Sequence, residues 1–109
     1  MTADEFRTIA SSFPGTEERA HMKHPDFRVR GKIFATLGYP DPEWGMVKLS
    51  PEQQQNYLDA APDVFHLAAG AWGRAGSTLV RLKPAKKTLV RKALETAWTQ
   101  VQGTPTPTR

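Results

Sequence analysis

The sequence predicts a two-layer α+β fold in which three helices cover one side of a mostly antiparallel sheet. Short stretches that alternate between apolar and polar residues follow one another through turns rich in glycine and proline, as the strands of an antiparallel sheet do. Three segments with a helical spacing of apolar residues flank or interrupt these stretches. The expected order is one helix, three or four strands, a second helix, one or two strands and a last helix.

The composition is that of one small globular domain. The chain has 109 residues and no cysteine, which excludes disulfides, thiolate metal sites and cysteine nucleophiles. We expect a single domain over residues 1–102 and a flexible tail over residues 103–109, which are rich in proline and threonine. No apolar run approaches the roughly 20 residues of a membrane span. The N-terminal sequence Met-Thr-Ala-Asp-Glu is not that of a signal peptide, so we expect a cytoplasmic protein with no membrane partner.

The chain is mildly basic. Its 15 Lys and Arg residues outnumber its 11 Asp and Glu residues, which gives a formal net charge of +4. Such basicity suits an anionic partner such as nucleic acid. A small protein can be equally basic without one, so charge alone leaves the partner open.

Capping signals mark the starts of the helices. Thr2 and Glu5 fit a capping box for the first helix. Ser50 is a favourable N-cap for the second, with proline directly after it and Gln53 placed to close a second box. The three expected helices span about residues 2–12, 51–60 and 84–101.

The clearest alternation surrounds Gly31 and predicts a β-hairpin. A two-residue loop there would pair Arg28 with Ile33 and mix polar with apolar residues on one face. A three-residue loop, Arg30–Lys32, keeps the apolar residues together, and burial of one face favours that register. Arg28 and Phe34 are then expected to share the outer face. Further strands are expected at residues 17–22, as a polar edge strand, at 44–49, at 77–82 and, as a brief strand or an anchored loop, at 64–67.

The outer face of this sheet is the candidate interface with nucleic acid. Basic side chains on an uncovered sheet can neutralise phosphates, and aromatic side chains can stack on bases. An ordinary solvated face is the alternative. The candidate phosphate contacts are Arg28, Arg30, Lys32, Lys48, Arg74, Arg81 and Lys83. The candidate stacking residues are Phe34, Trp44 and Trp72.

Residues 68–76 are expected to form a loop, because Gly70, Gly73 and Gly76 give it unusual backbone freedom. Arg74 and the loop amides could hold an anion, while Trp72 could stack on a base. Alternatively, Trp72 fills the core and the glycines allow tight turns. The loop lacks the lysine and hydroxyl of a P-loop, so nucleotide hydrolysis is not supported.

The sequence supports neither a metal site nor a catalytic centre. His21, His24 and Asp26 resemble metal ligands, but strand positions three apart point to opposite faces. Glu17 or Glu18 could form an acid–base pair with His21, but no nucleophile or phosphate cradle accompanies them. We therefore expect no metal, no cofactor and no catalytic residue.

Several motifs in order resemble the MmcQ/YjbR family, from about Phe6 to about Val101. They are Phe13-Pro14-Gly15-x-Glu17-Glu18, His21, Pro25-x-Phe27-Arg28-Val29-x-Gly31-Lys32-Ile33-Phe34-Ala35 and Ala71-Trp72-Gly73-Arg74-x-Gly76. Met22 and Lys23 depart from the pattern, since many members have an aromatic residue and a glycine there. The resemblance implies a small bacterial α+β domain, similar in outline to type III secretion chaperones and frataxin-like sheets. The family is commonly labelled DNA-binding.

Two functions of different classes follow. The first is a non-enzymatic domain that binds nucleic acid, DNA above all, through the basic face and adjoining loops. The second is a protein-interaction or chaperone-like module that uses an apolar patch around Tyr39, Trp44 and Trp72, or an exposed edge strand. An enzyme or small-ligand binder built on His21 and the glycine loop has the least support. The sequence leaves open whether the protein is a monomer or a weak dimer.

Overall fold

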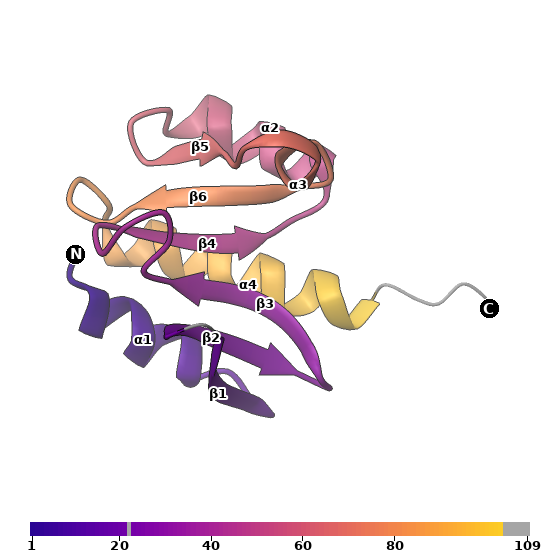
Figure 1. Cartoon of the computed structure of the whole chain (residues 1–109). Coiled ribbons are helices and arrows are strands. Elements are labelled where there is room, and N and C mark those ends of the chain that lie inside the picture. Colours follow the sequence, from indigo (N-terminus) through magenta and orange to yellow (C-terminus); the bar gives the residue numbers. More distant parts are fainter. Residues whose placement is uncertain (22, 104–109) are drawn as a thin grey trace.

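The computed structural model describes residues 1–21 and 23–103. In this part of the chain, four helices accompany one six-stranded sheet (Figure 1). In chain order the elements are α1 (Ala3–Ser11), β1 (Thr16–His21), β2 (His24–Val29), β3 (Lys32–Leu37), β4 (Trp44–Lys48), α2 (Pro51–Ala60), β5 (Phe65–Leu67), α3 (Gly70–Arg74), β6 (Ser77–Arg81) and α4 (Lys87–Gly103). The strand order is β1-β2-β3-β4-β6-β5, and every pair is antiparallel.

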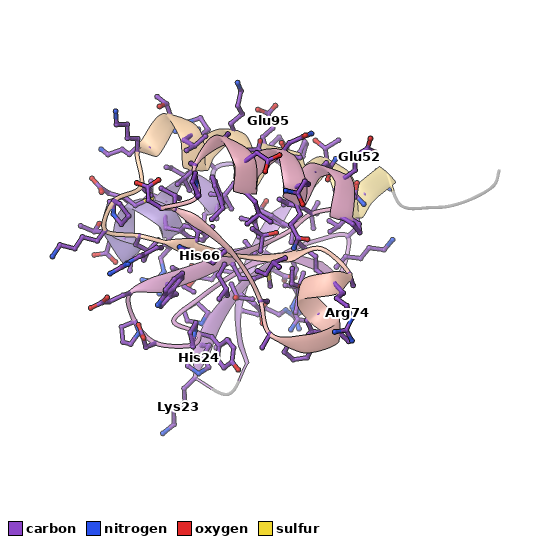
Figure 2. The ribbon with its side chains drawn as sticks, turned by 90° about the horizontal axis from the view of Figure 1, so that it is seen from above. Lys23, His24, Glu52, His66, Arg74 and Glu95 are labelled. Atoms are coloured by element: carbon purple, nitrogen blue, oxygen red, sulfur yellow. The ribbon has the colours of Figure 1, made fainter. Side chains whose placement is uncertain are left out.

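α1, α2 and α4 form one layer against one face of the sheet. α4 packs on β2, β3 and β4, and α1 packs on α4 and the neighbouring strands. The hydroxyl groups of Tyr57 in α2 and Thr96 in α4 lie 2.9 Å apart in a hydrogen bond. Figure 2 shows Glu52 of α2 and Glu95 of α4 on one side of the sheet, and His24 and Arg74 on the other. The predicted two-layer α+β class is confirmed, with one more helix than expected.

The capping boxes form as predicted. The Thr2 hydroxyl accepts a hydrogen bond from the amide of Glu5, whose carboxylate accepts one from the amide of Thr2. Ser50 and Gln53 make the same exchange at α2. The last helix, however, begins at Lys87 and not at Pro84-Ala85. It continues to Gly103, so the predicted tail overlaps it by one residue, and residues 104–109 lie outside the described part of the chain.

The hairpin of β2 and β3 has a two-residue turn, so the predicted three-residue loop is wrong. Val29 pairs with Lys32, and the turn residues Arg30 and Gly31 have φ angles of 54° and 76°. Both angles are positive, as in a type I′ turn. The register shifts farther along, between Phe27 and Arg28.

A β-bulge reconciles this turn with burial of one face. Phe27 pairs with Ala35 and Arg28 pairs with Ile33, so Phe34 is the extra residue on β3. Phe34 and Ala35 are both buried, while Ile33 lies opposite Arg28 and is only half-buried. The prediction that Phe34 shares the outer face with Arg28 is therefore wrong.

Aromatic side chains fill the space between α1, α4 and the hairpin. The ring of Phe13 stacks on Trp98 at 5.8 Å and meets Phe34 edge-on at 6.5 Å. The indole N–H of Trp98 donates to the carbonyl of Pro14 at 3.1 Å. The chain that leaves α1 is thus held against α4, and Phe34 reaches this cluster only because the bulge turns it inward.

The two-residue turn predicts opposite effects of two substitutions. Gly31→Ala should lower the free energy of unfolding by about 1 kcal/mol, because alanine is strained at a positive φ. Arg30→Asn should raise it by up to about 1 kcal/mol, because asparagine tolerates this conformation better than arginine. Urea denaturation of both variants tests the turn. A destabilising Arg30→Asn would contradict it.

The carboxylate of Glu5 predicts a loss of stability in acid. The hydrogen bond from the Thr2 amide, and then Lys87 at 3.0 Å, lower the pKa of Glu5 below its ordinary value. A lowered folded pKa contributes stability above the unfolded value, about 4.3, and this stability is lost as the pH falls through the folded value. As the pH falls below about 4.3, the melting temperature of Glu5→Gln should therefore decrease less than that of the wild type. Glu95→Gln, an exposed control, should melt as the wild type does at each pH.

Candidate nucleic-acid interface

Four basic side chains lie at one end of the sheet. Arg30 is in the β2–β3 turn, and Lys32 is the first residue of β3. Because β3 and β4 are antiparallel, the start of β3 lies at the same end as Lys48, the last residue of β4. Lys48 pairs with Ser77, the first residue of β6, and α3 ends just before it at Arg74. We call Arg30, Lys32, Lys48 and Arg74 the basic end; the β2–β3 turn, the end of β4 and α3 lie at the right of Figure 1.

The charges of the basic end are not neutralised within the described residues. All four side chains are exposed, and none has an ion-pair partner there. Glu52 also follows β4, in the first turn of α2. Figure 2 shows it on the helix-covered side of the sheet, away from Arg74. The four cations are therefore free to meet an external anion.

Arg28, which was expected on the outer face as a phosphate contact, forms an ion pair within the protein. Its Nε and Nη2 atoms donate to the two carboxylate oxygens of Asp26 at 2.8 and 3.2 Å. Asp26 is only 1% exposed. The hydrogen bond to Asp26 raises the pKa of Arg28, and Glu17 across β1 adds to the effect. This bidentate pair leaves little of the Arg28 charge for a phosphate.

The remaining predicted cations lie at the opposite end of the sheet. Arg81 pairs with Trp44, the first residue of β4, and Lys83 follows β6. The neighbouring loop contributes Glu43, whose carbonyl accepts a hydrogen bond from the amide of Leu82. The middle of the outer face is uncharged, because Thr36, Met46 and Leu79 lie side by side across β3, β4 and β6. The structure therefore divides the predicted basic residues between two ends of the sheet.

The three candidate stacking residues differ in burial and in position. Phe34 is fully buried in the core and cannot meet a base. Trp44 is half-buried and its ring meets His66 edge-on at 5.2 Å. Trp72 is 71% exposed, so the suggestion that it fills the core is wrong. The apolar patch proposed around Tyr39, Trp44 and Trp72 does not form, because Tyr39 and Trp44 flank the loop at the other end of the sheet.

The segment predicted as an open loop contains the short helix α3. A Cβ atom on Gly73 would lie 1.9 Å from the carbonyl oxygen of Ala68. One on Gly76, where φ is 118°, would lie 1.8 Å from that of Leu49. These two glycines allow the backbone of α3 and the following turn to pack closely against neighbouring backbone. The amides of Ala75 and Gly76 donate to carbonyl oxygens of α3, so these two amides are not available to an anion.

Gln54 of α2 anchors α3, and the sequence did not reveal it. Its buried amide nitrogen donates to the carbonyl oxygens of Gly73 and Ser77 at 2.9 and 3.0 Å, and to the hydroxyl of Thr78 at 3.1 Å. Gln54 stands within a run of three glutamines, where no periodic signal distinguishes it. It joins three elements and so positions the backbone that carries Trp72 and Arg74.

Among residues 1–21 and 23–103, no group of three or more His, Asp or Glu side chains is placed to hold a metal ion. In the same residues no helix has the length and apolar character needed to cross a membrane.

The structure defines a small α+β domain whose sheet is covered on one face and carries a basic end. The YjbR family model matches residues 11–100, so the chain belongs to the YjbR family. The fold is similar to the crystal structure of Deinococcus radiodurans protein DR2400, which has the family-model domain DUF419. The two chains share 17% identity with a TM-score of 0.77, over 94% of this chain and 80% of that chain. No curated protein matches this chain.

The role of Gln54 predicts a site-specific loss of stability. Gln54→Leu should lower the free energy of unfolding by about 1–3 kcal/mol, because buried acceptors on α3 and β6 lose their donor. Gln55→Leu changes an exposed neighbour whose side chain donates to Asp59 and should cost less than about 0.5 kcal/mol. Chemical denaturation of both variants measures the difference. Equal costs would show that the Gln54 network does not hold α3.

Proposed function

We propose that this domain binds the phosphate backbone of DNA at its basic end and acts by binding alone, without catalysing a reaction. One observation carries the proposal. Arg30, Lys32, Lys48 and Arg74 come from three separate segments, lie at the same end of the sheet, and have no ion-pair partner among the described residues. Unpaired cations in one region are what a polyanion requires.

The chemistry of these side chains defines the expected mode of binding. Lysine and arginine contacts to phosphates position the nucleic acid without reading its sequence. Four such contacts correspond to a slope of log affinity against log salt of about −3 to −4, or roughly a 100-fold loss between about 50 and 200 mM salt. The expected binding is thus tolerant of sequence and sensitive to salt.

A protein partner is the second candidate function. Leu67, the last residue of β5, is 56% exposed, and Trp72 in the following helix is 71% exposed. β5 lies at the edge of the sheet, where an extended segment of another chain can pair.

Light scattering of the purified protein tests the simplest case, which is contact with a second copy of this chain. A monomer at all concentrations would remove that case.

Charge removal at the basic end tests the main proposal. The triple variant Lys32→Gln, Lys48→Gln and Arg74→Gln should bind duplex DNA at least about tenfold more weakly at low salt. It should also reduce the salt slope by about 3. Fluorescence anisotropy with a labelled duplex measures both quantities.

The control removes the same charge from the helix layer. Lys86→Gln, Arg91→Gln and Lys92→Gln alter exposed residues of the β6–α4 connection and α4 that have no ion pair among the described residues. This variant should keep the wild-type slope. Equal losses in the two triple variants would show that only net charge matters, and no binding at low salt would refute the function.

A further inference from the structure

We propose that Trp72 stacks on an unpaired base, so that the basic end binds single-stranded DNA in preference to continuous duplex. The inference deepens the proposed function and rests on it. It names the form of nucleic acid that the site binds. It assigns the preference for single strands to Trp72, whose ring contacts no other aromatic ring among the described residues.

The exposure of Trp72 sets it apart from the other aromatic residues. At 71% it is more exposed than Tyr39 at 54%, the next most exposed aromatic side chain. Its ring has no aromatic neighbour and its indole N–H has no hydrogen-bond partner among the described residues. Trp44 and Trp98, in contrast, each meet another ring. The indole face of Trp72 is therefore open to a ligand.

The element that carries Trp72 is firmly held. Gly73 packs its backbone against Ala68, with no room for a Cβ atom. Gln54 donates to the carbonyl oxygen of Gly73 at 2.9 Å, and Gly76 approaches the backbone of Leu49. An aromatic side chain on an anchored backbone loses little conformational freedom when it stacks, so more of the stacking energy is retained on binding.

Two of the cations lie next to the segment that carries Trp72. Lys48, the last residue of β4, pairs with Ser77, the first residue of β6. Arg74 precedes Ser77 by three residues, and Trp72 lies two residues before Arg74. A strand whose phosphates contact Lys48 and Arg74 would therefore pass close to the indole.

Base pairing determines whether the indole of Trp72 can stack on a base. Inside a duplex, away from its ends, each base is covered on both faces by its neighbours, so an aromatic side chain on the protein surface meets only the backbone. An unpaired base presents a free face, and stacking on an aromatic residue contributes a roughly 5- to 150-fold gain in affinity per base. Trp72 should therefore strengthen binding to single strands alone.

Two DNA probes and three variants test this inference with the full chain. The probes are labelled oligothymidylate of about ten nucleotides, the scale of one small binding site, and a much longer duplex, in which nearly every base lies away from an end. Trp72→Ala should weaken binding to the single strand about 5- to 150-fold and leave the duplex affinity within about twofold. Trp72→Phe keeps a stacking ring and should retain most of the affinity. Leu67→Ala, an exposed apolar control, should behave as the wild type does.

The outcomes separate the inference from the function on which it rests. Salt-sensitive binding of both probes with no effect of Trp72→Ala would overturn the stacking role and leave the phosphate-binding function standing. Equal weakening of both probes would overturn the preference for single strands. Binding of neither probe would overturn both proposals, and a loss of self-association in Trp72→Ala without any loss of DNA affinity would assign the residue to a protein contact.

Discussion

Packing of α4 against one face of the sheet is the interaction on which the other features depend. The helix buries an apolar stripe, formed by Val90, Ala93, Leu94, Ala97 and Val101, against three of the strands. Because only one face of the sheet is covered, most of the apolar strand residues point to that side. The uncovered face carries the remaining side chains, with Met46 and Leu79 half-buried at its middle. The charged turns and α3 lie at the ends of the strands.

The β2–β3 hairpin shows how the chain satisfies this requirement. A two-residue turn places Arg28 opposite Ile33, and a regular hairpin in that register would turn Phe34 and Ala35 to opposite faces. One extra residue at Phe34 lets both enter the core. The same turn contains Arg30. Arg28 lies two residues from Asp26 on β2, and that carboxylate neutralises it. Core packing thus decides which hairpin charges remain available at the surface.

The placement of α3 depends on contacts across the fold. Gln54 lies 19 residues before Gly73 and 24 before Thr78, yet it bonds to both. Gly73 and Gly76 admit the neighbouring backbone where any larger residue would collide. Together they hold an exposed tryptophan beside unpaired cations. Such an exposed ring adds nothing to the core, which is why we assign it a role in binding.

The sequence by itself determined the two-layer α+β class, the capping boxes at Thr2 and Ser50, the edge strand β1 and the approximate bounds of most elements. Each depends on residues that are close in the chain, so local patterns are sufficient to predict it. Only the tertiary structure decided the bulge at Phe34, the helix within residues 70–74 and the exposure of Trp72. It also divided the predicted cations between two ends of the sheet. These features depend on which distant residues pack together and which charges find a partner, and neither is written in the local pattern of apolar and polar residues.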